Sequence, residues 1–368
     1  MEQPKLVCDF TRISNSQSNF FQQLFSIVTK LRQSTPNGEK VKTHGCALLE
    51  RQGTPEAVSE STTRVLQAAW RPSTHAKYKC LQGKWNAFCS EAKADHFDPG
   101  INIVLKFLTL YFDKGHSYKS IASYLSIVRK NVVLTEKDNL LLKRFMKGVY
   151  NLRPPVKKHM ATWDVCILLN HLRNMRIVTP MDISKKLSSL FMILAGTRVN
   201  SLFHMVITNF YLTDSECTFT FDSVLKHSRQ GFDASPITFR AFPQEPDLCP
   251  VITAKIYLKY RLTISSDIGF FVATTKPHGA ASSSTIARWI KETLSEAGID
   301  TGRFTAHSCR ASSTSAASLA GIDIITITKS AGWSSDSTFY KHYKKDITLY
   351  YKDTFVFSLL QACRPLIT

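Results

Sequence analysis

Two arginines, a histidine, a tryptophan and a late tyrosine occur in an order that suits metal-free cleavage of a phosphodiester. They are Arg198, His307, Arg310, Trp333 and Tyr343. A phosphodiester under attack gathers negative charge on its non-bridging oxygens, and two guanidinium groups can bind these oxygens bidentately without losing their protons. Arg198 and Arg310 suit that task. A tyrosine hydroxyl has an ordinary pKa near ~10, so it needs a base and a positively charged pocket before it attacks phosphorus.

The proton transfers of such a reaction also have candidate residues. His307 lies one helical turn before Arg310 and could accept or relay the tyrosine proton. Lys226 lies where a strand-rich stretch, 219–237, turns through a polar segment, and could protonate the leaving sugar oxygen as general acid. Arg229 follows in the same turn. Lys226 is favoured because lysine, unlike arginine, can give up a proton.

The C-terminal residues resemble those of the tyrosine recombinases and phage-type integrases. Residues 306–311 read Ala-His-Ser-Cys-Arg-Ala, and residues 331–343 read Ala-Gly-Trp-Ser-Ser-Asp-Ser-Thr-Phe-Tyr-Lys-His-Tyr. These two sequence motifs are most similar to those of the recombinases of DIRS-like and Ngaro-like mobile elements. The resemblance extends in order and spacing over residues 62–345. Its specificity comes from four pieces in the right order, because His-x-x-Arg alone occurs in many chains.

The resemblance implies a role for each candidate. Arg198 and Arg310 would bind the scissile phosphate, and Lys226 would protonate the leaving 5′ oxygen. His307 would assist proton transfer. Trp333 would take the place of a second histidine and donate its single N–H to a phosphate oxygen. No metal, nucleotide or other cofactor would be needed.

The choice of nucleophile lies between two tyrosines. The resemblance implies that Tyr343 forms a 3′-phosphotyrosine link. Tyr340 lies one helical turn earlier and would point from a similar face. The step from Trp333 to Tyr343 is ten residues, one more than is usual in phage-type members. We favour Tyr343 because the Phe-x-x-x-Tyr ending resembles the mobile-element branch, and Tyr340 stays the alternative.

Charge and composition narrow the class of partner. The 368 residues carry a formal net charge of +19, which favours double-stranded DNA, since neutralised phosphates give salt-sensitive affinity. A soluble basic protein or one that touches anionic membrane is the alternative. No apolar run approaches the ~20 residues of a membrane-spanning helix. The nine cysteines follow no Cys-x-x-Cys or zinc spacing and indicate reduced thiols. We expect Cys309 to be a small buried hydrophobe.

The apolar periodicity predicts a helical region before the linker. Its expected helices are one opening at 65–70, one capped by Ser73, 103–112, one capped by Ser117, and 140–149. The resemblance implies that residues 61–152 form a SAM-like core-binding domain that clamps one side of the duplex, after a partly flexible arm at 1–60. Basic residues between the apolar positions are candidates for phosphate contact; they are Lys77, Lys79, Lys84, Lys119, Arg129 and Lys130.

The sequence Arg153-Pro-Pro-Val-Lys-Lys158 breaks helix and adds charge. We expect an interdomain linker at 153–160, with Arg153, Lys157 and Lys158 beside the DNA backbone. A mainly helical catalytic domain with a small antiparallel β-sheet would follow at 161–345. Its expected helices are 163–172, 184–195, 250–260, 282–297 and 307–319. The two domains would form a C-shaped clamp. The apolar tail, 346–368, would pack on a neighbouring subunit, or else on its own domain.

The resemblance therefore predicts a site-specific recombinase or integrase of a mobile element. Strand exchange joins two duplexes, so a homotetramer on DNA is expected, and nuclear location follows if the host is a eukaryote. One alternative is a catalytically lapsed, domesticated DNA-binding protein, although the intact candidate residues count against it. The other is a tyrosine-type (IB) topoisomerase acting as a monomer. The helical clamp and the apolar tail favour recombination.

Overall fold

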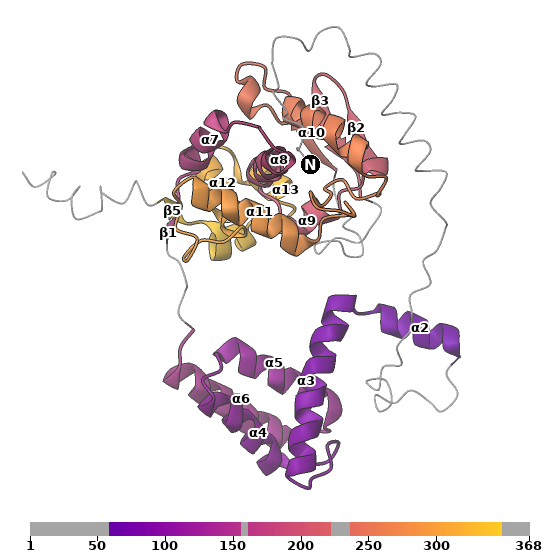
Figure 1. Cartoon of the computed structure of the whole chain (residues 1–368). Coiled ribbons are helices and arrows are strands. Elements are labelled where there is room, and N and C mark those ends of the chain that lie inside the picture. Colours follow the sequence, from indigo (N-terminus) through magenta and orange to yellow (C-terminus); the bar gives the residue numbers. More distant parts are fainter. Residues whose placement is uncertain (1–58, 156–160, 222–235, 348–368) are drawn as a thin grey trace, which may run out of the picture. The chain divides into compact units, whose positions relative to one another are not determined.

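The computed structural model describes residues 59–155, 161–221 and 236–347. These residues fall into two compact units, one ending before residue 159 and one after it, and both are mainly helical (Figure 1). Within the described ranges, no helix combines the length and apolar character needed to cross a bilayer. The predicted arm falls almost wholly in 1–58, outside the described residues, and most of the predicted tail falls in 348–368.

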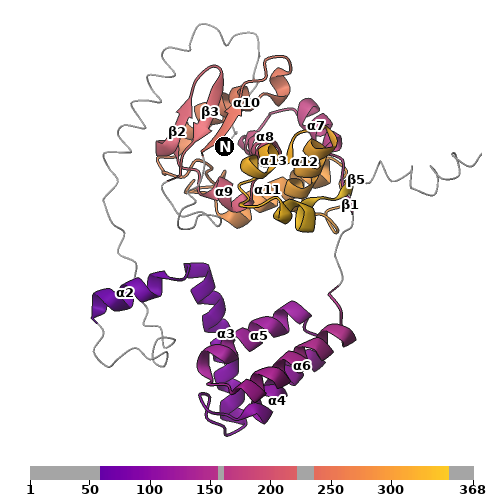
Figure 2. The same ribbon diagram turned by 180° about the vertical axis from the view of Figure 1, so that it is seen from behind.

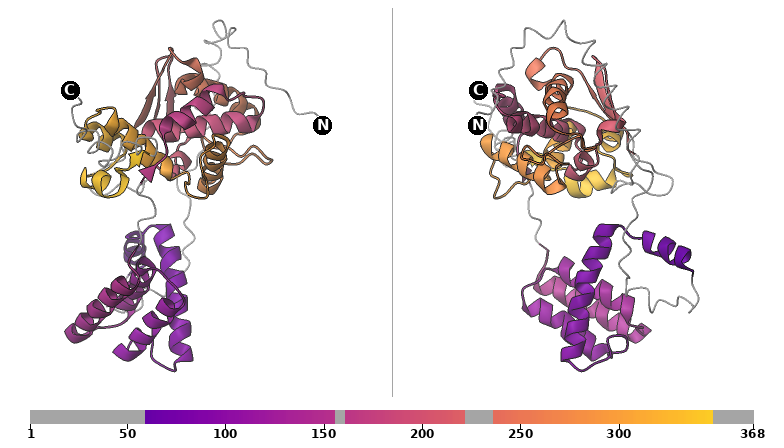
Figure 3. Two further views of the ribbon diagram at one scale, coloured as in Figure 1. Left: turned by 90° about the vertical axis from the view of Figure 1, so that its left-hand side faces the viewer. Right: turned by 45° about the vertical axis from the view of Figure 1, so that its right-hand side comes forward.

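The first unit is built around a buried tryptophan, and Figure 3 shows its helices, indigo to magenta, from two sides. Its described helices are α2 Glu60–Ala68, α3 Pro72–Glu91, α4 Ile101–Asp113, α5 Tyr118–Asn131 and α6 Glu136–Leu152. Trp85 of α3 is fully buried. Its Nε1 donates to the His96 carbonyl at 2.9 Å. Its ring packs edge-on against that of Phe107, with ring centroids 4.9 Å apart. The indole thus fills the core with its one polar atom satisfied.

Local sequence fixes where these helices begin. Ser117 caps α5, as predicted, through its side-chain oxygen. At the start of α6, Thr135 and Asp138 form a capping box that the sequence analysis did not predict. The predicted cap Ser73 is wrong, because α3 already begins at Pro72. Proline has its backbone φ preset for the first helical position and needs no amide hydrogen there.

The second unit carries all of the described strands. Its helices are α7 Val165–Asn174, α8 Pro180–Ala195, α9 Val199–Phe203, α10 Pro250–Ile264, α11 Ser283–Glu296, α12 Ser308–Leu319 and α13 Ile324–Ser330. Its strands are β1 Ala161–Thr162, β2 Phe210–Leu212, β3 Glu216–Phe219, β4 Ile237–Arg240 and β5 Asp346–Ile347. Short 3-10 turns occur at Ile207–Asn209 and Pro246–Leu248, and a π-helical turn at Phe339–Tyr343. The helices predicted for this part of the chain are present with small shifts at their ends.

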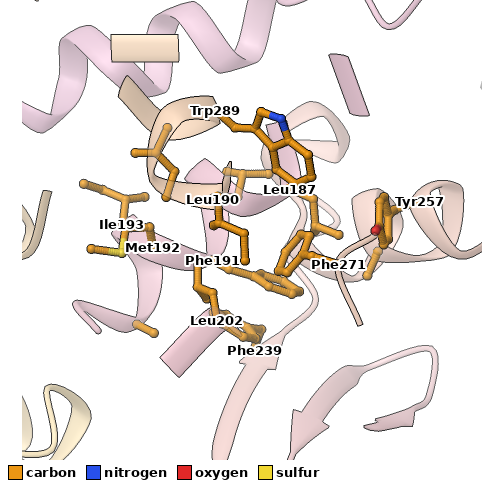
Figure 4. Packing of buried hydrophobic residues seen from close by; sticks show 14 of the residues in the cluster. Leu187, Leu190, Phe191, Met192, Ile193, Leu202, Phe239, Tyr257, Phe271 and Trp289 are labelled. Carbon is orange, nitrogen blue, oxygen red and sulfur yellow. The ribbon is translucent and has the colours of Figure 1, made fainter. Parts of the chain in front are cut away.

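Helix α8 is the centre of the second unit. It is buried on nearly every side, as expected for a helix surrounded by others, and it packs against α10, α11, α12 and β4. Figure 4 shows its apolar side chains among those of α11 and the sheet. Phe191 stacks on Phe239 of β4, with ring centroids 4.1 Å apart. This core fixes the end of α8, after which Arg198 follows.

Two small sheets complete the second unit. Strands β2, β3 and β4 form an antiparallel sheet in that order, with Cys217 opposite Phe239, which confirms the predicted small antiparallel sheet. Strands β1 and β5 pair in parallel, with Thr162 opposite Ile347, and this pair was not predicted. Figure 2 shows both strands beside α12. The first and last described elements of the unit therefore meet.

Candidate active site

Arg198 lies in the turn between α8 and α9. Gly196 ends α8 with a φ of +54°, a left-handed conformation that glycine adopts without steric cost. A Cβ at this glycine would lie 3.2 Å from the Thr314 side chain of α12, so the turn packs tightly on that helix. Arg198 then takes the N-cap position of α9 and is half-buried.

Arg310 is held inside the unit on α12 and is fully buried. Its Nη2 donates to the Ala331 carbonyl at 2.7 Å. Its Nε and Nη1 have no hydrogen-bond partner within the described part of the chain. Burial first, and then the charge of Arg198, lower the pKa of Arg310 to about 10. A buried, under-satisfied cation beside a second cation would be stabilised by an anion.

Trp333 lies beside this guanidinium. It follows the turn after α13 and is 5% exposed. The Arg310 Cζ atom lies 4.6 Å from the indole centroid, a cation–π distance. The indole Nε1 is buried and has no hydrogen-bond partner among the described residues. The site thus holds unsatisfied N–H donors on two neighbouring side chains.

Tyr343 packs onto the same pair. Its ring centroid lies 4.6 Å from that of Trp333 and 5.1 Å from the Arg310 Cζ atom. Its hydroxyl lies 3.5 Å from Nε2 of His307, which precedes the first residue of α12. The structure therefore brings together Arg310, His307, Trp333 and Tyr343, as the sequence analysis expected.

Tyr340 lies elsewhere, and the expectation that it shares a face with Tyr343 is wrong. Its side chain is 54% exposed and contacts Lys344, whose Nζ lies 5.4 Å from the ring centroid. The reason is the π-helical turn, closed by the bond from Lys344 N to Phe339 O at 2.8 Å. Hydrogen bonds in this turn span five residues, so positions three apart no longer lie one above the other.

Four of the predicted positions fall outside the described residues. Lys226 and its alternative Arg229 belong to 222–235, and Lys157 and Lys158 belong to 156–160. Their roles stay predictions.

Three of the basic side chains predicted to contact phosphate interact with other side chains of the first unit. Lys77 donates to the Ser123 hydroxyl at 3.3 Å. Lys84 donates to the Tyr124 hydroxyl at 3.1 Å, which raises the pKa of Lys84. The Lys130 ammonium lies 3.4 Å from the centroid of one ring of Trp70.

Arg153 is the most firmly held of these cations. Its Nη1 donates to the carbonyls of Phe112 and His116, both at 2.9 Å. Its Cζ atom lies 4.3 Å from the Phe112 ring centroid. Arg153 therefore ties the end of α6 to the end of α4, a role the sequence analysis missed.

Lys79, Lys119 and Arg129 are exposed. Arg129 lines a groove of about 940 Å³ between α5 and α6, together with Lys143 and Lys147. These two lysines were not predicted as DNA contacts, although their four-residue spacing on a predicted helix places both on one face.

Cys309, between His307 and Arg310, is fully buried, which confirms its prediction as a small core residue. Burial raises the pKa of its thiol to about 12. Among the described residues, no three His, Cys, Asp or Glu side chains gather in a group that could hold a metal ion.

Comparison with known proteins gives one family and one fold. Residues 160–348 match the phage integrase family. The XerH site-specific recombinase bound to palindromic difH substrate, in a post-cleavage complex, is similar with a TM-score of 0.53, 17% identity, and coverage of 74% of this chain and 77% of that chain. For the XerH pre-cleavage complex the values are 0.52, 14%, 77% and 80%. A lambda integrase dimer bound to a COC′ core site gives 0.48, 14%, 78% and 93%. No curated protein matches the chain.

Proposed function

Because the chain belongs to the phage integrase family of tyrosine recombinases, enzymes that break and rejoin DNA strands, we propose that it recombines DNA at specific sites through Tyr343. Its finer assignment is to a mobile element, whose DNA it would integrate or excise. That assignment is supported by the wording of residues 331–343, which resembles the recombinases of DIRS-like and Ngaro-like elements.

The observation that carries the proposal is the set of unsatisfied donors around one tyrosine. Arg310 Nε, Arg310 Nη1 and Trp333 Nε1 have no hydrogen-bond partner in the described part of the chain. Both side chains contact the Tyr343 ring. Buried polar groups without partners are costly, and the non-bridging oxygens of a phosphodiester are acceptors that would satisfy them. The same contacts would stabilise the charge that develops in the transition state.

The proposed reaction begins with attack of the Tyr343 hydroxyl oxygen on phosphorus. Its proton passes to His307, and the bond between phosphorus and the 5′ oxygen breaks. Lys226 gives that oxygen a proton, leaving a free 5′ hydroxyl and a 3′-phosphotyrosine. A 5′ hydroxyl from the partner strand then attacks the phosphotyrosine and gives its proton to Lys226, while the Tyr343 oxygen leaves phosphorus and takes back its proton from His307. The energy of the broken bond is conserved in the covalent link, so the scheme calls for neither metal nor nucleotide.

Double-stranded DNA is the proposed substrate. The net charge of +19 supports it, and the XerH structures of similar fold hold their difH substrate. Exchange between two duplexes would require four copies of the chain, two on each duplex. In a eukaryotic host the enzyme would act in the nucleus.

The test is covalent trapping on nicked suicide duplexes drawn from the DNA that flanks the gene. After a nick beside the cleavage site, the short 5′-ended fragment diffuses away and the tyrosyl adduct persists. Wild type and Tyr340→Phe should form an adduct that survives denaturation. Tyr343→Phe should lower its formation by ~10⁴-fold or more, as expected when a nucleophile is removed.

Peptide mass mapping of the adduct decides between the alternatives. An adduct on Tyr340 would overturn the assignment of the nucleophile while keeping the reaction. Salt-sensitive binding without an adduct on any sequence would favour a lapsed DNA-binding protein. Relaxation of supercoiled DNA by a monomer, without strand exchange, would favour the topoisomerase.

A further inference from the structure

One hydroxyl of α12 binds the backbone on both sides of Lys344, the residue that follows Tyr343. Ser315 is 2% exposed. Its Oγ donates to the Tyr343 carbonyl at 2.9 Å and accepts from the Lys345 amide at 3.0 Å. The donor and the acceptor capacity of this hydroxyl are therefore both used on the segment that carries the tyrosine.

This use of a helical serine is not the ordinary one. A serine or threonine inside a helix commonly donates to a carbonyl of the preceding turn. Its neighbour Thr314 does so, with Oγ1 bonded to the Arg310 carbonyl at 2.7 Å. Ser315 instead bonds to the end of the π-helical turn and to the residue after its C-cap. Arg310 lies on the same helix, so α12 connects the phosphate-binding candidate directly to the backbone of Tyr343.

A second serine extends the connection to the start of the unit. Ser312 lies one turn before Ser315, and its hydroxyl hydrogen-bonds that of Thr162 at 2.5 Å. Thr162 belongs to β1, which pairs with β5 directly after Lys345. The segment that carries Tyr343 is thus held by α12 through Ser315 and by β1 through β5, and β1 is itself held by α12.

We propose that Ser315 is a positioning residue for the cleavage reaction: it holds Tyr343 at the distance from Arg310 that attack on a bound phosphate requires. This inference rests on the proposed function of Tyr343 as nucleophile. Reaction rates fall steeply when reacting atoms are misplaced, so that an error near 1 Å can cost ~10²-fold. Loss of the hydroxyl releases two backbone contacts at once and lets the tyrosine segment shift against α12.

The test compares Ser315→Ala with Thr314→Val. Each removes one buried hydroxyl from neighbouring positions of α12, but only the first touches the Tyr343 segment. In single-turnover trapping on the suicide duplex, Ser315→Ala should slow adduct formation by roughly 10- to 100-fold with DNA affinity within about twofold of wild type. Thr314→Val should stay within a few-fold of wild type in both measurements.

Two further readouts separate positioning from proton donation and from general loosening. On a substrate with sulfur as the bridging 5′ atom, the leaving group needs no proton, so a general-acid defect is rescued, whereas Ser315→Ala should stay slow. In hydrogen exchange of the free protein, the Lys345 amide should exchange faster in Ser315→Ala than in wild type. Its exchange rate in Thr314→Val should equal that of wild type.

Failure of the Ser315 inference and failure of the proposed function give different results. If wild type forms its adduct and Ser315→Ala matches its rate, or if the Lys345 amide keeps its protection, the inference is overturned and the proposed function stands. If wild type forms no adduct on Tyr343, the proposed function fails and the inference falls with it.

Discussion

Arg153 in the first unit and Arg310 in the second are two basic side chains that are held in opposite ways. In the first unit, Arg153 donates to two carbonyls and lies over a phenyl ring, and Lys84 donates to a tyrosine. In the second unit, Arg310 is fully buried, yet two of its three nitrogens have no hydrogen-bond partner among the described residues. A satisfied cation stabilises the fold, whereas a buried and unsatisfied one costs stability that a ligand would return. Unsatisfied donors on two adjacent side chains that both contact Tyr343, Arg310 and Trp333, therefore point to the site more directly than positive charge does.

The largest effect is expected from replacing Arg310, the arginine without a full set of hydrogen bonds. Arg310→Met should lower adduct formation by about 10²- to 10³-fold, because it removes donors that stabilise charge in the transition state. Single-turnover trapping measures it, with the exposed Arg303→Met as control for loss of one positive charge. Equal losses in both variants would mean that charge alone, and not the placement of Arg310, supports the reaction.

The substitution Arg153→Met tests the role of the hydrogen-bonded arginine in the first unit. Loss of two hydrogen bonds from a charged donor should lower the free energy of unfolding by about 2 kcal/mol. Denaturant titration of the full chain measures it. Lys147→Met, an exposed change on the same helix, should stay within about 0.5 kcal/mol. If Arg153→Met instead weakened DNA binding at unchanged stability, the predicted phosphate contact would be the main role of this side chain.

The cost of burying Arg310 gives the third prediction. Arg310→Met should raise the free energy of unfolding without DNA by about 1 kcal/mol, since an apolar side chain replaces a poorly satisfied buried charge. The pKa of Arg310 is lowered from 12.5 to about 10, so between these values the unfolded chain binds more protons and wild-type stability rises with pH. The advantage of the variant should be complete below about pH 10 and shrink above it. A variant less stable than wild type in denaturant titrations at pH 8 would show that the Ala331 bond outweighs desolvation.

The smallest effect concerns the groove between α5 and α6. Arg129→Gln should weaken DNA binding a few-fold and reduce the salt slope by ~0.9, the value for one phosphate contact. Glu136 lines the same groove, so Glu136→Gln should change affinity in the opposite direction. Fluorescence anisotropy across a salt series measures both. No change in either slope would place the DNA on another face of this unit.

The sequence predicted most of the helices because apolar periodicity reflects burial directly. It missed features that depend on partners far along the chain. The pairing of β1 with β5 joins two-residue strands from opposite ends of the unit, and so short a strand has no pattern of its own. The π-helical turn has no sequence pattern of its own, so the sequence did not reveal that Tyr340 would turn outward.

The candidate site was predicted in the same way as the fold: its reactive residues could be named from the sequence, but their distant partners could not. Arg310, Trp333 and Tyr343 could be nominated together because their chemistry is specific and their order is fixed. Ser315 could not be nominated, since a serine in a helix looks the same whether it bonds its own turn or a distant segment. The bonds of Arg153 to Phe112 and His116 could not be predicted for the same reason, because charge is visible in a sequence and its partners are not.

The pairing of β1 with β5 has a consequence for exchange of the unit between proteins. Among the described residues of this unit, the first strand, which begins at Ala161, lies beside the last, which ends at Ile347. A module whose ends meet can be joined to a different preceding module without rearranging its interior, as domain insertion requires. We expect a unit whose first and last described strands pair to tolerate the replacement of the unit that precedes it during evolution.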